Sequence, residues 1–391
     1  MTTDAPPPEA SLAILDDWAN IASKHFSHIP NLTVTSFPET LSPSNPSELN
    51  DLVTRLRPYT IISTMRERTP LPSSLLSQLP NLRLILTTGI RNASIDLTHC
   101  KSHSITIAGT KGTRPTYYDA QGNPIHTSPS VSRPSTPPNT ATSLSPLPPG
   151  YSSTTQHTLS LLLALTSRIP FDDHALKTSP SAWQSGLTMP LAGKTLGVVG
   201  LGKLGAQFAR ACALALGMKV VAWSSSLTQE RADGAAREVG LGLGLGLGAA
   251  GAIRAVGKAE LFAVADVVSV HYVLSERSRG LVGRRELEGM KRGAVLVNTA
   301  RGPVVDEEAL LDVLERGRIR GAALDVFWSR EPLEGDSRWR TTEWGKDGRG
   351  EVVLSPHMGY VNESTMEGWY AEQAVDVERW VRGEEVGFRI A

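Results

Sequence analysis

An arginine, a glutamate and a histidine each follow an apolar run in the C-terminal half of this chain. Arg301 follows AVLV, Glu331 follows GAALDVF and His357 follows VVL. Runs this short and apolar are typical of strands buried on both faces of a parallel sheet. Because ligands of open α/β sheets bind beyond the carboxyl ends of the strands, we expect the three side chains at one edge of one sheet.

These residue types suit a redox reaction of a 2-oxo or 2-hydroxy acid. An arginine offers a planar, permanently charged fork that matches a carboxylate. When hydride reaches a carbonyl carbon, the oxygen gains negative charge, and a histidine can give it a proton near neutral pH. A carboxylate beside that histidine orients the ring and favours its protonated form. Each residue taken alone has an alternative role that is equally plausible: Arg301 could form an ion pair at a strand end, Glu331 could begin a turn and His357 could cap a loop. The presence of all three at strand ends favours a catalytic site.

A glycine motif upstream indicates the hydride donor. The segment GVVGLGKLG lies between an apolar, strand-like run and the helix-like AQFARACALAL. In a G-x-G-x-x-G at such a junction, the glycines permit the tight turn, the approach of a pyrophosphate and close packing of helix on strand. A glycine-rich turn of some other α/β protein is the alternative. Read with the three residues above, the motif predicts a nicotinamide dinucleotide at Gly200, Gly202, Lys203, Leu204 and Gly205.

The strand after the glycine motif, KVVAW, ends in three serines, and Ser224 and Ser225 are predicted to face the ribose. A carboxylate at this place binds the ribose diol of NAD and repels the 2′-phosphate of NADP. Without one, either NAD or NADP is admissible. Arg231 could pair with a 2′-phosphate, although a solvated surface charge is the more frequent role of such an arginine.

Residues 11–110 form a separate α/β pattern, in which apolar runs alternate with helix-like stretches. This alternation predicts a second parallel sheet. We expect strands at 11–15, 32–35, 59–62, 82–86 and 105–107, and helices at 16–26 and 47–56, the latter capped by Ser47. Residues 111–150 are rich in proline, serine and threonine and are predicted to be a disordered insertion, either a lid or docking segment or, more simply, a tolerated loop.

Composition narrows the class of protein. The 391 residues carry 39 basic and 39 acidic side chains, so no net charge favours a nucleic-acid partner. The two cysteines, Cys100 and Cys212, suggest neither a disulfide framework nor a metal site and fit a reducing compartment. No secretory signal is visible, and the most apolar stretch, Leu159 to Leu165, is too short to span a bilayer. We therefore expect a soluble, cytoplasmic protein without a membrane partner.

Taken together, these segments resemble the D-isomer-specific 2-hydroxyacid dehydrogenases. The resemblance rests on GVVGLGKLG, on MKRGA running into VNTARGPVVDEEAL, on GAALDVF followed by EPL, and on SPHMGY. It implies a Rossmann cofactor domain at 151–357 and a flavodoxin-like substrate domain formed by 1–110 and 358–391, with a cleft between them. It also implies a homodimer that acts on a small 2-oxo or D-2-hydroxy acid, as glyoxylate/hydroxypyruvate reductases and phosphoglycerate dehydrogenases do.

The resemblance assigns roles to individual residues. Arg301, Glu331 and His357 match the catalytic residues of the family, and Asp325 matches an aspartate that contacts the nicotinamide carboxamide. Cofactor contacts are also expected at Thr299, Ala300 and Arg301, and substrate contacts at Arg66, Gly89, Ile90, Arg91 and Arg301.

Two departures from the family pattern concern the catalytic segments. One extra residue separates Asp325 from Glu331, which puts the position of Glu331 in question. The long helix beginning near Ser153 carries Thr155-Gln156-His157 where the family has an Ala-Glu-His type of motif. As an alternative to an enzyme, some relatives are nucleotide-binding co-repressors, and the chain could be such a scaffold. Formate oxidation is a weaker alternative because it expects glutamine at the position of Glu331.

Overall fold

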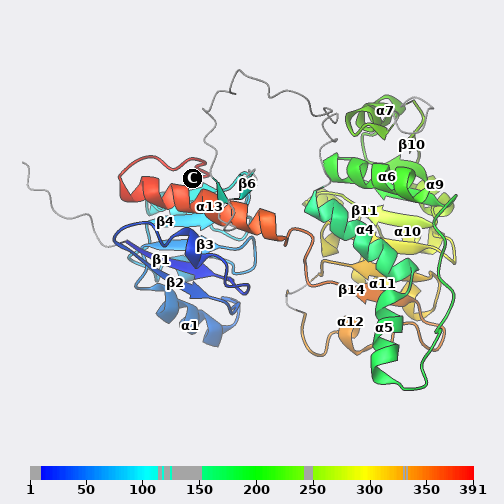
Figure 1. The fold of residues 1–391 in the computed structure, drawn as a ribbon, viewed down its shortest axis with the longest axis horizontal. Coiled ribbons are helices and arrows are strands. Elements are labelled where there is room, and N and C mark those ends of the chain that lie inside the picture. The colour runs from blue at the N-terminus through cyan, green and yellow to red at the C-terminus, as the bar shows by residue number, and fades with distance from the viewer. Residues whose placement is uncertain are drawn as a thin grey trace, which may run out of the picture. The chain divides into compact units, whose positions relative to one another are not determined.

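The computed structural model describes residues 10–112, 117–118, 124–125, 152–241, 250–328, 331 and 333–391. The chain divides into two compact units (Figure 1). The first comprises Met1–Thr140 and Asn362–Ala391, and the second Ala141–Val361. Each unit contains its own parallel sheet, which confirms the predicted α/β fold with two parallel-sheet domains. The exact domain boundaries stay a prediction, because most of 111–150 lies outside the described residues. Within that stretch, Tyr117–Tyr118 (β6) and Pro124–Ile125 (β7) form a short antiparallel pair.

The first unit has a five-stranded sheet in the order β2-β1-β3-β4-β5, which is the flavodoxin-like order. Its strands are β1 (Ala10–Leu15), β2 (Leu32–Phe37), β3 (Ile61–Thr64), β4 (Leu84–Thr87) and β5 (Thr106–Gly109). Its helices are η1 (Ser23–His25), α1 (Pro46–Leu56), α2 (Ser73–Leu76), α3 (Leu97–Ser102) and α13 (Glu363–Val381). All five predicted strands of this unit are therefore present.

The strand residues of this sheet alternate between two helical layers. Ile62 packs with Leu52 and Leu56 of α1 in the apolar core of one face. The next residue, Ser63, points the other way and donates a hydrogen bond from Oγ to Gln373 Oε1 of α13 at 2.7 Å. This period of two is what a pleated strand buried on both faces requires. The C-terminal segment then pairs with β5, where Ile390 N–H donates to the Ile107 carbonyl at 2.7 Å and so covers the sheet edge.

Two local predictions for this unit were wrong. Residues 16–26 do not form the predicted helix and contain only the three-residue η1, because Asp16 and Asn20 adopt φ of +60° and +51°. The carboxylate of Asp17 accepts the N–H groups of Ile21 and Ala22 and closes a turn in place of the helix. Helix α1 is capped by Asn45 rather than Ser47: Asn45 Oδ1 accepts Ser47 N–H at 3.0 Å.

The second unit has a seven-stranded sheet in the order β10-β9-β8-β11-β12-β13-β14. Apart from its extra edge strand, this is the Rossmann order with the crossover between β8 and β11. Its strands are β8 (Thr195–Val199), β9 (Lys219–Trp223), β10 (Arg254–Ala255), β11 (Val267–Val270), β12 (Val295–Asn298), β13 (Gly321–Leu324) and β14 (Glu351–Leu354). Its helices are α4 (Ser153–Thr166), α5 (Ile169–Thr178), α6 (Lys203–Leu216), α7 (Gln229–Glu238), α9 (Lys258–Val264), η2 (Glu276–Ser278), α10 (Arg284–Gly289), η3 (Gly302–Val304), α11 (Glu307–Glu315) and α12 (Arg338–Thr341).

Helices cover both faces of this second sheet. Val267 and Val295 pack in one core with α4, α6 and α7, whereas Val268 and Leu296 pack in the other with α9, α10 and α11. Burial on both faces explains why these strands read as continuous apolar runs in the sequence. Most polar side chains of these strands consequently lie at the strand ends, and the carboxyl ends carry the glycine loop, Arg301 and Asp325.

Candidate active site in the second unit

The glycine loop joins β8 to α6 in the conformation that its residue types allow. Gly200 has φ of +97°, a region that side chains rarely adopt. At Gly205 an added Cβ would lie 2.4 Å from the Gly200 carbonyl oxygen, so only glycine lets α6 pack this closely. At Gly202, the N-cap of α6, an added Cβ would meet nothing within 4 Å. Gly202 therefore borders open space in front of the helix N-terminus, where the pyrophosphate of a dinucleotide fits.

Serines follow β9, and the contacts of this segment are polar. Ser225 Oγ lies 3.0 Å from the hydroxyl of Tyr272, which follows β11. Arg231 donates from Nη1 to the carbonyl of Ser226 at 2.9 Å, which holds its guanidinium beside the serine turn. A cavity of about 600 Å³ lies here and is lined by Ser226, Thr228, Glu230, Arg231 and Arg237.

The loop that carries Arg301 is held by its own side chains. Asn298, at the end of β12, accepts Ala300 N–H at 3.0 Å and donates to the Arg301 carbonyl at 3.1 Å. Thr299 Oγ1 is 2.8 Å from Thr158 Oγ1 on α4. Arg301 itself donates from Nη1 to the Ala300 carbonyl at 2.8 Å. Its guanidinium thus stays at the loop, with further N–H groups to bind an anion.

Glu331 and His357 come together in this unit, despite the extra residue before Glu331. His357 Nδ1 contacts Glu331 Oε2 in a short hydrogen bond. The other oxygen, Glu331 Oε1, accepts Phe327 N–H at 3.3 Å. With Nδ1 engaged by the carboxylate, Nε2 is the ring nitrogen that can exchange a proton with a substrate.

Asp325 lies in a buried hydrogen-bond network, which also includes a residue that the sequence prediction left without a role. His157 Nε2, on α4, is 2.9 Å from Asp325 Oδ1 and 2.9 Å from Ser355 Oγ. The Asp325 side chain is 1% exposed. Burial by itself raises the pKa of this carboxyl, but hydrogen bonds from His157 and Ser355 and the charge of His157 lower it below its usual value. The only sequence signal for His157 was its place in the helix motif that departs from the family pattern.

The expected substrate residues of the first unit surround the carboxyl ends of β3 and β4. Gly89 N–H already donates to Thr110 Oγ1 at 2.7 Å, and Arg66 N–H donates to Thr88 Oγ1 at 2.8 Å. The guanidinium of Arg66 lies directly over Gly89, where an added Cβ would be 2.2 Å from Arg66 Nη1. Ile90 is 54% exposed, so the loop after Gly89 is open to a ligand.

A comparison with models of protein families identifies the family of this chain. A model of the NAD-binding domain of D-isomer specific 2-hydroxyacid dehydrogenases matches residues 159–359, which is more than half of the chain. The chain belongs to the D-isomer specific 2-hydroxyacid dehydrogenase family. Within this family it is 33% identical to the D-3-phosphoglycerate dehydrogenase of Archaeoglobus fulgidus over 206 residues, which are 53% of this chain and 34% of the relative. It is 32% identical to the glyoxylate reductase of Thermococcus litoralis over 231 residues, 57% of this chain and 62% of the relative.

Solved structures share this fold over nearly all of the chain. The phosphoglycerate oxidoreductase of Vibrio cholerae superposes with a TM-score of 0.73 at 28% identity, covering 96% of this chain and 99% of that one. The D-lactate dehydrogenase of Escherichia coli, at 16% identity and a TM-score of 0.68, covers 97% and 100% and shares the fold. In sequence, however, the chain spans only about a third of the length of the phosphoglycerate dehydrogenases that it matches. These comparisons give no support to a co-repressor-like scaffold.

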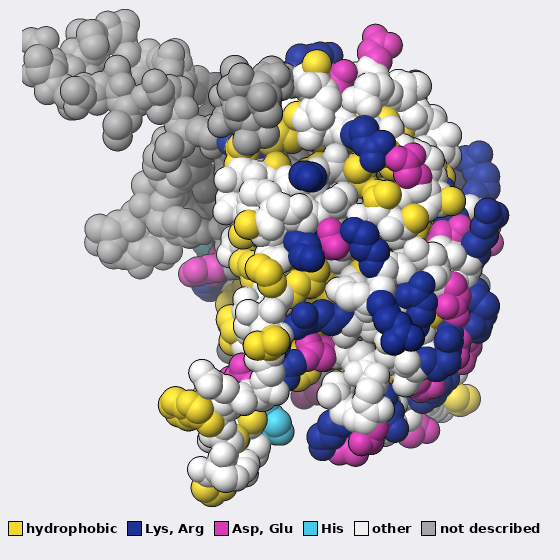
Figure 2. Space-filling view, turned by 90° about the vertical axis from the view of Figure 1, so that its right-hand side faces the viewer, with side chains coloured by type: hydrophobic (Ala, Val, Ile, Leu, Met, Phe, Trp, Pro, Cys, Tyr) yellow, Lys and Arg dark blue, Asp and Glu magenta, His cyan; other side chains and the backbone are white. Residues whose placement is uncertain are grey.

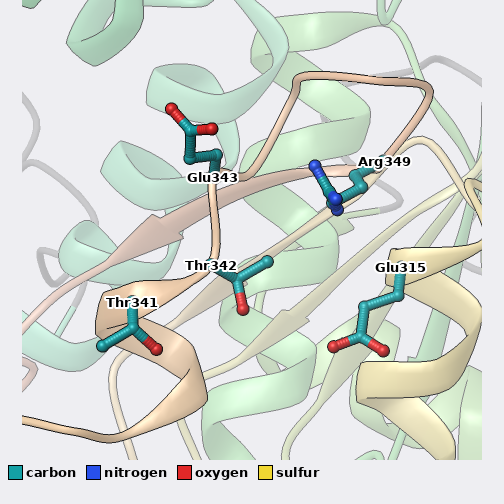
Figure 3. Close-up of a pocket in the computed structure, with 5 residues that line it drawn as sticks. All are labelled: Glu315, Thr341, Thr342, Glu343 and Arg349. Atoms are coloured by element: carbon teal, nitrogen blue, oxygen red, sulfur yellow. The ribbon is translucent and has the colours of Figure 1, made fainter.

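Other features of this family member lie apart from the site. The cavity in Figure 3, of about 510 Å³, is lined by Glu315, Thr341, Thr342, Glu343 and Arg349. It lies near the start of β14, and β14 begins at the sheet edge opposite the glycine loop, so we assign this cavity no part in the site. Among the described residues, no group of histidine, cysteine, aspartate or glutamate side chains could hold a metal ion. The helices in the described part of the chain are too short or too polar to cross a membrane.

On the face of the molecule drawn in Figure 2, basic and acidic side chains are interspersed. Ion pairs join helices α10 and α11, as between Arg284 and Asp312 at 2.5 Å. Neighbouring charges of opposite sign offset each other, so the electrostatic potential of this face is neither strongly positive nor strongly negative.

Proposed function

We propose that this family member is an oxidoreductase that transfers hydride between a nicotinamide cofactor and a small 2-oxo acid or D-2-hydroxy acid. The observation that carries the proposal is the pair formed by Glu331 and His357, which lies in the same unit as a dinucleotide-type glycine loop. The nicotinamide, when bound, supplies or accepts the hydride.

We propose the following roles in the direction of reduction. Arg301 binds the substrate carboxylate through its guanidinium. His357 donates the proton from Nε2 to the oxygen that becomes the hydroxyl, and Glu331 stabilises the ring in its protonated form and fixes its orientation. In the oxidative direction the same nitrogen accepts the proton from the hydroxyl. For the first unit we propose that Arg66, Ile90 and Arg91 bind the substrate. The Gly89 N–H is not included because it already donates to Thr110 Oγ1.

We propose that the ribose end accepts NADP(H) as well as NAD(H). Neither Ser224 nor Ser225 carries a charge that would repel a 2′-phosphate, and Arg231 is held next to the serine turn by its bond to Ser226. Glu230 lines the same cavity, but Arg231 and Arg237 leave the group with net positive charge.

We also propose a homodimer in the cytoplasm. Helix α5 has no buried residue, and large apolar side chains on it and on the segment after it face solvent, with exposures of 60% for Ile169, 55% for Leu176, 76% for Trp183 and 89% for Leu187. A surface of this kind favours burial against a second copy.

Cys100 and Cys212 are free, buried thiols, which fits a reducing compartment. Sedimentation at several concentrations tests the dimer, and microscopy of a tagged chain tests the location.

A direct assay tests the proposed activity. The absorbance of NADH or NADPH is followed with glyoxylate, hydroxypyruvate and related 2-oxo acids at saturating concentration. Oxidation of the cofactor by at least one acid is expected from the wild-type chain, and a much slower rate from His357→Ala. Equal rates for the two chains would contradict the role given to His357, and no turnover with any acid would contradict the activity.

A further inference from the structure

Three tryptophans form a stack that begins at Trp328, four residues after the end of β13. The rings of Trp328 and Trp339 are 5.3 Å apart at 7°, and those of Trp339 and Trp344 are 5.8 Å apart at 28°. Trp339 is the buried centre, at 2% exposure. All three indole N–H groups are bonded: Trp328 to the Val305 carbonyl, Trp339 to Glu307 and Trp344 to the Trp339 carbonyl.

Trp328 joins two loops that carry proposed active-site residues. Its indole N–H donates to the Val305 carbonyl at 2.6 Å, and Val305 directly follows the short helix η3, which begins right after Arg301. The peptide between Phe327 and Trp328 lies against Gly302, where an added Cβ would be 2.1 Å from the Phe327 carbonyl oxygen. Phe327 and Trp328 are thus fastened to the Arg301 loop by a side chain and by close backbone packing.

The adjoining peptide, between Val326 and Phe327, reaches the proposed acid–base pair. Phe327 N–H donates to Glu331 Oε1 at 3.3 Å, while Glu331 Oε2 contacts His357 Nδ1. A displacement of the backbone at 327–328 would therefore move a donor of the glutamate that orients His357. The extra residue between Asp325 and Glu331 lengthens this segment, which makes an anchor at its start more important for the position of the carboxylate.

We propose that Trp328 is a positioning residue for the Glu331–His357 pair. By holding the 327–328 peptide on the Arg301 loop, it keeps the Glu331 carboxylate against His357 Nδ1. It also fixes the positions of the two loops relative to each other. The inference rests on the proposed function of His357. The competing interpretation is that Trp328 only fills the core, as stacked aromatic side chains usually do.

The stack offers a matched control for this distinction. Trp328→Phe and Trp344→Phe each keep an aromatic ring and remove one indole N–H, but only Trp328 is attached to the Arg301 loop. We expect Trp328→Phe to lower kcat for the 2-oxo acid about tenfold, since small displacements of catalytic groups are costly, with little change in KM for the cofactor. We expect Trp344→Phe to stay within about twofold of wild type. Thermal unfolding of both variants reports any general loss of stability.

A double-mutant cycle tests whether Trp328 acts through Glu331. In a Glu331→Gln background, adding Trp328→Phe should reduce kcat by less than about twofold, because the group that Trp328 positions is already impaired. A full tenfold loss in that background would overturn the inference, and so would equal losses for Trp328→Phe and Trp344→Phe in the parent chain.

A measurement that needs no turnover separates this inference from the proposed function. The ring-nitrogen signals of His357, identified by their loss in His357→Gln, are compared by NMR at one fixed pH. In Trp328→Phe their chemical shifts should move from the wild-type values toward those in Glu331→Gln, because the carboxylate is no longer held against Nδ1, whereas Trp344→Phe should match wild type. Unchanged chemical shifts in Trp328→Phe would overturn the positioning role even if no 2-oxo acid is reduced. Absence of turnover with the expected chemical shifts would overturn the proposed reaction alone.

Discussion

Asp325 holds the backbone immediately after His357. Its two carboxylate oxygens accept Met358 N–H and Gly359 N–H, each at 2.8 Å. His357 itself has φ of +57°, in the left-handed region that residues other than glycine adopt infrequently. Two charge-assisted bonds from a buried carboxylate therefore stabilise the turn that presents the proposed proton donor. Asp325 thus has a structural task in addition to the cofactor contact expected from the family resemblance.

Asp325→Asn should impair both stability and activity. An asparagine keeps the shape but has one acceptor oxygen instead of two, so one buried backbone N–H would face an amide group that cannot accept it. We expect the free energy of unfolding to fall by about 1–3 kcal/mol. The rate of 2-oxo acid reduction should fall with it. Urea denaturation and steady-state kinetics measure these effects, with the exposed Asp336→Asn as control. Equal unfolding curves for the two variants would contradict the task assigned to Asp325.

His357→Gln should remove proton donation while leaving cofactor binding intact. Because general acid catalysis contributes roughly 10²–10⁴-fold, kcat should drop by about that factor. The dissociation constant of NADH, followed by fluorescence, should change little. His28→Gln is a control, since His28 is an exposed histidine that also pairs with a glutamate, Glu378. A loss of NADH binding in His357→Gln that parallels the loss of rate would point to a role in the cofactor site instead.

Two glycines of the same loop should respond differently to alanine. In Gly205→Ala the new Cβ would lie 2.4 Å from the Gly200 carbonyl oxygen, so we expect a loss of stability of about 1–3 kcal/mol. In Gly202→Ala the Cβ meets no protein atom within 4 Å, and stability should stay within about 1 kcal/mol of wild type. The methyl group would instead occupy the pyrophosphate position and weaken dinucleotide binding by about tenfold or more. Thermal unfolding and cofactor titration of both variants separate the two effects, and similar profiles would refute this division.

The preference for NADPH or NADH should depend on the charge of the residues that follow β9. Ser224→Asp introduces a carboxylate that repels a 2′-phosphate and binds a ribose diol, so the ratio of kcat/KM for NADPH to that for NADH should fall about tenfold or more. Arg231→Leu should raise KM for NADPH and leave KM for NADH unchanged. If Arg231→Leu affects both cofactors equally, the arginine does not recognise the phosphate.

The stability of the second unit should depend on the protonation of His271. Burial lowers the pKa of His271 from 6.5 to about 4, so the folded chain favours the neutral ring, which contacts Ser269 Oγ at 2.9 Å. Stability from this group is present above the unfolded-state pKa and is lost as pH falls toward the folded-state value. Between pH 7 and pH 5 the loss should reach up to about 2 kcal/mol. His271→Gln should show a shallower decline of the urea midpoint over that range; an unchanged decline would assign the acid sensitivity to other groups.

Local effects explain where prediction from the sequence succeeded, and side-chain and tertiary contacts explain where it failed. The five strands of the first unit and helix α13 were predictable because buried parallel strands are short apolar runs and long helices show clear apolar patterning. The stretch 16–26 was not, because the side chain of Asp17 bonds the backbone at 21 and 22 and competes with the helix. His157 was also missed as a site residue. Its partners Asp325 and Ser355 are distant in sequence, and no local pattern indicates such a contact.

By itself, the sequence determined the two-sheet α/β architecture, the family and the strand ends at which Arg301, Glu331 and His357 would stand. Strand periodicity, glycine spacing and residue type depend on local chemistry, which the order of residues specifies. Only the tertiary structure decided that Glu331 reaches His357 in spite of its extra residue, and that Asp325 and His157 secure the adjoining turn. Such contacts depend on how loops from separate strands pack against each other, as Trp328 and Gly302 do, and that packing is a property of the folded chain.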